Sequence, residues 1–143
     1  MSIWHTQATL EALNAVSRMT MVEQLGIEFV EIGDDHLKAQ MPVDHRTVQP
    51  YGMLHGGASV TLAESLGSVA GYLCIDGNAK RVVGLDINAN HLRPVASGFV
   101  YGVARPVHLG NSTQVWEIRI TNEQDKLVCI ARLTLAVLDQ AAK

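Results

Sequence analysis

A short segment of small residues around a single carboxylate constrains this chain more than any other feature. Residues 54–65 read LHGGASVTLAES, so two glycines precede a run of small and aliphatic residues that contains Glu64. Glycines at a helix N-terminus leave backbone N–H groups open to an approaching oxygen. A carboxylate on the inner face of such a helix is costly to bury unless it is paired or used in chemistry. The segment therefore predicts a helix that begins near Gly56 and carries a paired or reactive Glu64.

The flanking sequence predicts an α+β fold built around that helix. No proline interrupts residues 56–73, which can form a helix of about 27 Å, and Gly67 and Gly71 suit close wrapping by a sheet. Alternating or apolar runs predict strands at 27–32, 37–43, 82–92, 99–107, 114–121 and 127–138, and helical spacing predicts short helices at 9–16 and 20–26. We expect one domain over residues 1–143, with an antiparallel sheet of five or six strands wrapped around one long central helix.

Composition narrows the classes of partner. The 143 residues are 48% hydrophobic, enough for a substantial core, and the formal charge of −3 gives no basic field for nucleic acid. The first residues contain neither a cationic segment nor a long apolar run, so we expect no secretion signal, no membrane association and a cytoplasmic location. Cys74 and Cys129 lie in apolar runs and are expected to be reduced. The six histidines lack metal-ligand spacing, so no metal is expected.

The order of these features resembles the hotdog-fold acyl-CoA thioesterases. His55-Gly56-Gly57 opens the helix and Glu64 follows eight residues after Gly56. The other matching pieces are Met41-Pro42-Val43-Asp44, Gln49-Pro50, Asn88-Ala89-Asn90-His91 and His108-Leu109-Gly110, so the resemblance covers nearly the whole chain. It is closest to the bacterial branch that hydrolyses aromatic acyl-CoA esters with a glutamate on the central helix. It implies a hotdog fold, thioester hydrolysis, and no cofactor apart from the CoA of the substrate.

The resemblance also implies roles for individual residues. Glu64 attacks the thioester carbon or activates water to do so. The Gly56 N–H and the Gln49 side chain polarise the carbonyl, and His55 helps to position or polarise it. The spacing of Ser68, four residues after Glu64 on the same helix face, predicts that its hydroxyl orients the carboxylate or the water. Contacts to CoA are implied for Gly84, His91, Leu92, Arg93, Pro94, His108, Leu109, Gly110, Asn111, Ser112 and Thr113.

The spacing along the helix then demands a second copy of the chain. Glu64 lies about 12 Å along the helix axis from Gly56, too far for both to reach one carbonyl. Two antiparallel helices would bring Glu64 of one chain to Gly56 of the other and give two equivalent sites. We therefore expect a homodimer with shared sites, and a tetramer of two such dimers. Because the implied CoA contacts include only one cation, Lys80, Arg81 and Arg105 are further candidates for the phosphates.

Simpler structural interpretations stay open for each of these residues. Glu64 could form an ion pair, and His55 could merely cap the helix. Gln49 could be an ordinary loop residue, and the Ser68 hydroxyl could bond to the helix backbone. Residues 91–93 could be a solvated strand end.

Several functions fit this pattern. An aromatic acyl-CoA is the expected substrate, with 1,4-dihydroxy-2-naphthoyl-CoA of menaquinone biosynthesis as the leading hypothesis and proofreading of misacylated carrier proteins as the alternative. Hydroxyacyl dehydratases share the architecture, but their histidine precedes Phe-Pro where this chain has Gly56-Gly57. A non-catalytic CoA-binding module would tolerate loss of Glu64. Apolar residues near the site by helical spacing, and so candidates for the acyl pocket, are Met53, Leu54, Val69 and Tyr72.

Overall fold

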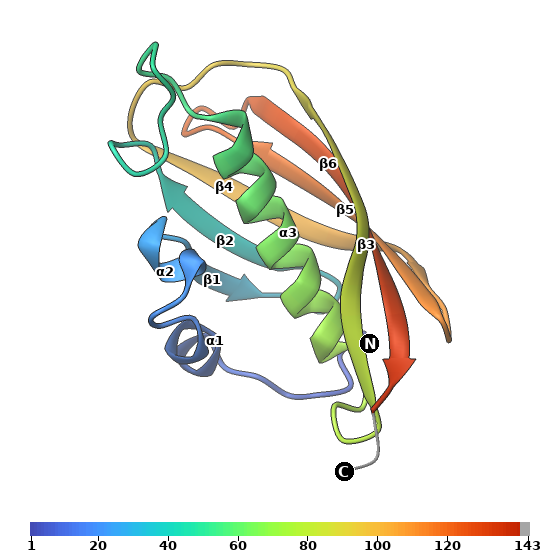
Figure 1. Cartoon of the computed structure of the whole chain (residues 1–143). Helices are drawn as coiled ribbons and strands as arrows, with labels where there is room; N and C mark the ends of the chain where they lie inside the picture. The colour runs from blue at the N-terminus through green and yellow to red at the C-terminus, as the bar shows by residue number, and fades with distance from the viewer. Residues whose placement is uncertain (141–143) are drawn as a thin grey trace.

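The computed structural model describes residues 1–140, in which a six-stranded sheet curves around one long helix, α3 (Gly56–Leu73) (Figure 1). The strands are β1 (Glu28–Ile32), β2 (Leu37–Pro42), β3 (Lys80–His91), β4 (Phe99–Leu109), β5 (Thr113–Thr121) and β6 (Leu127–Asp139). Their order in the sheet is β1-β2-β4-β5-β6-β3, and all neighbours are antiparallel. Two short helices, α1 (Leu10–Val16) and α2 (Met21–Gln24), precede the sheet. The predicted α+β class and hotdog architecture are confirmed.

The small residues of α3 let the sheet approach the helix backbone. An ideal Cβ at Gly67 would lie 2.5 Å from Leu133 Cδ2, and one at Gly71 would lie 2.4 Å from Leu135 Cδ1. Both leucines belong to β6 and are fully buried. Because a methyl group at either glycine would overlap these side chains, the close wrapping predicted from the sequence is present.

Strand β4 extends past the end predicted for it. The apolar run predicted a strand over 99–107, ending just after Pro106, but the strand continues to Leu109. The register of the β4–β5 ladder shifts between Pro106 and His108, which is the signature of a β-bulge. The bulge carries the strand past the proline, whose missing N–H would otherwise interrupt the ladder.

The two edges of the sheet are β1 and β3. Strand β3 is 12 residues long and pairs with β6 on one side only within residues 1–140. A register shift between Gly84 and Asp86 leaves Leu85 as the extra residue of a bulge, and Leu85 is 61% exposed. A long edge strand with exposed apolar side chains is a template for pairing with another strand.

Within the described part of the chain, none of the helices combines the length and the apolar character needed to cross a bilayer.

Candidate active site

Glu64 lies in the middle of α3 with one carboxylate oxygen buried and unpartnered. Among residues 1–140, Oε2 makes no hydrogen bond and Glu64 joins no salt bridge, so the structural ion pair is not found there. An ideal Cβ at Gly84 of β3 would lie 3.4 Å from Oε2, so the edge strand passes directly against the carboxylate. A buried polar oxygen without a partner costs free energy, which a bound molecule or a second chain can remove.

The start of α3 presents one free backbone amide. His55 is the N-cap residue, and its Nδ1 accepts a hydrogen bond from the Gly57 N–H at 2.8 Å. The Ala58 and Ser59 N–H groups donate to the His55 carbonyl oxygen at 3.0 and 3.2 Å. Of the first-turn amides in the described chain, only Gly56 N–H has no acceptor. The capping interpretation of His55 is therefore confirmed, and Gly56 keeps the amide that can bind a carbonyl oxygen.

Gln49 lies in the loop before α3 with its side chain already oriented. Its Oε1 accepts a hydrogen bond from the Tyr51 N–H at 2.5 Å, and its carbonyl oxygen accepts one from Gly52 N–H at 2.8 Å. Gly52 has φ +80°, which a glycine adopts without strain. With its oxygen engaged, the Gln49 side chain retains its amide N–H groups as donors.

A cavity of about 390 Å³ opens at the start of α3. It is lined by Gln49, Met53, Leu54, Gly56, Ser59, His91, Leu92, Arg93, Pro94 and Val128. The structure thus brings Gln49 and Gly56 together with the predicted CoA contacts at 91–94. Arg93 is held there because its Nη1 donates to the Leu127 carbonyl oxygen at 2.9 Å. Ser59 was not predicted as a lining residue, although its position three residues after Gly56 puts it on the same helix face.

A second, apolar cavity of about 540 Å³ lies beside the C-terminal half of α3. It is lined by Thr6, Gln7, Ala8, Thr9, Ala12, Leu13, Val16, Ser68, Val69, Tyr72, Leu73 and Val82. Seven of these residues come from the N-terminal segment and α1, which nothing in the local sequence pattern marked as part of a site. Of the predicted acyl-pocket residues, Val69 and Tyr72 line this cavity, whereas Met53 and Leu54 line the other one.

Ser68 lines the apolar cavity one turn after Glu64. Neither hydrogen bond considered for its hydroxyl, to the Glu64 carboxylate or to the Glu64 backbone carbonyl, is present in residues 1–140. The neighbouring Ser65 does bond back to the helix, since its Oγ donates to the Thr61 carbonyl oxygen at 2.6 Å. The Ser68 hydroxyl is therefore available to a molecule in the cavity.

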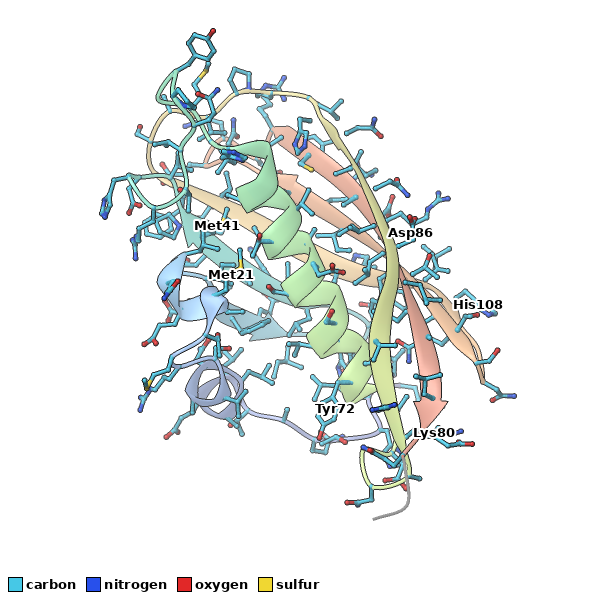
Figure 2. All side chains as sticks on the ribbon, in the orientation of Figure 1. Met21, Met41, Tyr72, Lys80, Asp86 and His108 are labelled. Atoms are coloured by element: carbon cyan, nitrogen blue, oxygen red, sulfur yellow. The ribbon has the colours of Figure 1, made fainter. Side chains whose placement is uncertain are left out.

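The predicted CoA contacts at 108–113 lie far from those at 91–94 in the same chain. His91 pairs with Cys129 of β6, whereas His108 and Thr113 lie level with Thr134 and Ala136 of that strand. Five to seven residues of β6 separate the two sets, or about 20 Å at the usual strand rise. Figure 2 shows His108 on the end of β4 that extends away from the start of α3. One chain does not bring the two sets together.

The additional cations considered for phosphate binding are partly engaged. Lys80 Nζ lies 2.9 Å from Asp139 Oδ1, and Arg105 Nη1 lies 2.9 Å from Asp35 Oδ1. Both pairs are largely exposed, and such pairs exchange readily with other anions.

The sulfur atoms and histidines form no recognisable metal centre in the described residues. Cys74 and Cys129 are free thiols. Burial raises the pKa of Cys74 to about 11 and also raises the pKa of Cys129, which disfavours the thiolate form of both residues. Among residues 1–140, no three His, Cys, Asp or Glu side chains are grouped so that they could hold a metal ion.

Comparison with known proteins identifies the family of this chain. The family model described as "Thioesterase superfamily" matches residues 51–129. The chain is 60% identical over 136 residues to 1,4-dihydroxy-2-naphthoyl-CoA hydrolase of Escherichia coli, covering 95% of this chain and 99% of that protein. It is 56% identical over 137 residues to proofreading thioesterase EntH of Cronobacter turicensis, covering 95% and 98%.

A solved structure is similar along nearly the whole chain. The crystal structure of a mutant of thioesterase PA1618 from Pseudomonas aeruginosa superposes with a TM-score of 0.96 at 52% identity, covering 97% of this chain and 100% of that one. The family model, the two relatives and the solved structure therefore agree on the family and the fold. The chain belongs to the thioesterase superfamily and has its hotdog fold.

Proposed function

We propose that this protein hydrolyses an aromatic acyl-CoA thioester to the free acid and CoA, with 1,4-dihydroxy-2-naphthoyl-CoA as the first candidate substrate. The observation that carries the proposal is the buried, unpartnered Oε2 of Glu64 beside Gly84. The substrate candidate is supported by the 60% identity to the E. coli enzyme of that name. The reaction would serve menaquinone biosynthesis, and a cytoplasmic location stays a prediction.

The proposed site is shared between two copies of the chain. Glu64 and the free Gly56 amide are separated by eight residues of one helix, about 12 Å. Antiparallel pairing of the exposed β3 edges would set the two α3 helices side by side and bring Glu64 of one chain to Gly56 of the other. The same two-fold arrangement would carry the 108–113 turn of one chain toward residues 91–94 of its partner. A homodimer, and a tetramer of two dimers, therefore belong to the proposal.

In this arrangement each part of the substrate has its own surroundings. The acyl group enters the apolar cavity beside Ser68, Val69 and Tyr72, because an aromatic ring prefers apolar walls. The CoA arm leaves through the cavity that contains His91 and Arg93 at the start of the other chain's helix. The thioester carbonyl lies between them.

The chemistry follows from those positions. The Gly56 N–H and the Gln49 side-chain amide donate to the carbonyl oxygen and stabilise the negative charge that develops on it. Glu64 adds to the carbonyl carbon or removes a proton from the water that does so. His55 maintains the helix start through its cap, and the Ser68 hydroxyl orients the carboxylate or the water.

A second substrate class has direct support. The 56% identity to a proofreading thioesterase nearly equals the identity to the naphthoyl-CoA hydrolase, so release of misacylated carrier proteins is the alternative function. Carrier-bound and CoA-bound thioesters share the pantetheine arm and the reacting bond. The two substrates differ only beyond the pantetheine arm, where one carries a nucleotide and the other a carrier protein.

The decisive experiment compares wild type, Glu64→Ala and Glu64→Gln in a thiol-release assay. The substrates are naphthoyl-, benzoyl- and straight-chain CoA esters and an aroyl carrier protein. We expect both variants to lose activity by about 10²-fold or more while still binding the CoA ester. Glu11→Gln changes an exposed residue of α1 outside the cavity lining, and this matched control should behave as wild type. Equal rates for wild type and Glu64→Ala would contradict the proposal.

A further inference from the structure

The imidazole of His91 lies directly against the start of α3. His91 is the last residue of β3, and an ideal Cβ at Gly56 would lie 2.9 Å from its Nε2 and 3.2 Å from its Cε1. Glycine at position 56 therefore does more than free an amide, since any side chain there would displace the ring. The ring edge that bears Nε2 faces the residue whose N–H is proposed to hold the carbonyl oxygen.

His91 is also the one imidazole that lines that cavity within the described chain, and imidazole is the side chain most often used as a general acid. The one charged side chain beside it is Arg93, and the titratable residue opposite it in the β3–β6 ladder is Cys129. His55 does not line the cavity, and its Nδ1 is occupied by the Gly57 N–H. The two imidazoles near the helix start thus have different environments, and only that of His91 faces the space proposed for the CoA arm.

We propose that His91 is the general acid that protonates the departing sulfur of CoA. The inference rests on the proposed function, because it takes the carbonyl oxygen to lie at the Gly56 amide and the CoA arm to lie in the cavity of His91. The sulfur is bonded to the carbonyl carbon, so it lies beside the Nε2 edge of the ring. This role differs from a contact with the nucleotide, which would place His91 far from the reacting bond.

The nucleophile is either a carboxylate oxygen of Glu64 or a water molecule that Glu64 deprotonates. It adds to the carbonyl carbon, and the C–S bond then breaks with its electron pair going to sulfur. Sulfur takes the proton of His91 Nε2 and leaves as the thiol. Water supplies the oxygen of the product acid, and its proton passes through Glu64 to solvent. His91, which is exposed, regains a proton from solvent. One water is consumed and no other reactant is needed.

General acid catalysis has a distinctive dependence on the leaving group. An alkyl thiol such as that of cysteine has a pKa of about 8.5, so its thiolate is a fairly basic leaving group. Donating a proton to the sulfur while the C–S bond breaks therefore speeds its departure. A thiophenol is more acidic and leaves without help. Removal of the acid should therefore slow alkyl thioesters strongly and aryl thioesters little.

The test uses His91→Gln and His91→Ala with three esters of one aromatic acid: the CoA ester, the N-acetylcysteamine ester, which lacks the nucleotide, and the thiophenyl ester. We expect kcat to fall by about 10²-fold on both alkyl thioesters and by less than about threefold on the thiophenyl ester. Added imidazole should partly restore His91→Ala. His45→Gln, which changes a histidine whose side chain is 89% exposed, is the matched control.

Four results would overturn the assignment. A loss confined to the KM of the CoA ester, and absent from the N-acetylcysteamine ester, would make His91 a nucleotide contact. An equal loss of kcat on all three esters would make it a structural residue, as would a parallel loss of the thermal unfolding transition in both variants. A wild type inactive on every thioester would instead refute the proposed function, and this inference with it.

Discussion

At the scale of single residues, glycines decide how closely helix and sheet approach. An ideal Cβ at Gly71 would lie 2.4 Å from Leu135 Cδ1 and 2.7 Å from Gln114 Oε1. In an exposed helix, Gly→Ala stabilises by about 1 kcal/mol. Here we expect Gly71→Ala to destabilise the protein by about 1–3 kcal/mol, because the methyl group overpacks a buried contact. Urea unfolding measures the difference.

The control for Gly71→Ala is Gly57→Ala, the same substitution at the start of the same helix. Gly57 is exposed, and a Cβ there would meet only the exposed ring of His55, at 3.0 Å from the Nδ1 that caps the helix. Gly57→Ala should leave the free energy of unfolding unchanged or raise it slightly. If Gly71→Ala were as stable as Gly57→Ala, close packing would not be the reason for glycine at position 71.

Some residues of the site follow from local sequence patterns, whereas others meet only in the folded chain. Glu64 and Gly56 could be predicted, because a carboxylate in an apolar run and glycines at a helix start are local patterns. The position of the His91 ring over Gly56 could not be predicted from the residues alone, since 35 positions separate the two and only the folded sheet brings them together. The predicted Ser68 hydrogen bond was equally out of reach, because helical spacing fixes a face and not a side-chain rotamer.

At the scale of elements, the loop before α3 is held by an ion pair that should respond to acid. The Asp44 carboxylate accepts hydrogen bonds from the side chain and from the backbone N–H of Arg46. The side-chain bond makes the larger contribution, and together the two bonds lower the pKa of Asp44 from 3.8 to about 2. Because the folded-state pKa lies below the unfolded value, the stabilisation is complete above about pH 4 and is lost as the pH falls from 3.8 toward 2.

The resulting prediction concerns Asp44→Asn. This variant should have a lower thermal midpoint than wild type at pH 7, and the gap should be much smaller at pH 2, where the wild-type carboxyl is about half protonated in the folded protein and almost fully protonated in the unfolded chain. Thermal unfolding at the two pH values measures it. A gap of equal size at pH 2 would mean that the carboxylate charge does not stabilise the loop that presents Gln49.

Helix α1 lines the apolar cavity, a position that its own sequence does not indicate. Its own pattern is that of an ordinary amphipathic helix, yet α1 packs against β1 and forms one side of the apolar cavity through Ala12, Leu13 and Val16. Periodicity predicted where the helices and strands lie, because burial repeats along each element. It does not specify which faces of two distant elements enclose a space between them.

A matched pair of substitutions on α1 tests its part in substrate selection. Ala12→Phe should fill the cavity and lower kcat/KM for naphthoyl-CoA by about tenfold or more relative to acetyl-CoA. Ala15→Phe lies on the same helix outside the cavity lining and should leave that ratio unchanged. Parallel losses on both substrates would indicate general damage and not a change in pocket size.

At the scale of the whole molecule, two separations within one chain point to the same assembly. Glu64 and Gly56 lie about 12 Å apart on α3, and the two predicted sets of CoA contacts lie about 20 Å apart along the sheet. A two-fold axis near the middle of the β3 edge would close both gaps at once. The first separation could be predicted from helix geometry, whereas the second required the strand registers.

Mixed dimers test this arrangement directly. Glu64→Ala and Gln49→Ala should each be nearly inactive alone. In a mixed dimer, one site carries both substitutions, and the other combines the intact Glu64 of one chain with the intact Gln49 of its partner. Co-expression with random pairing should therefore restore about a quarter of the wild-type activity, because half of the dimers are mixed and each has one working site. Activity that stays at the sum of the two separate variants, despite demonstrated mixed dimers, would mean that each chain builds its site alone.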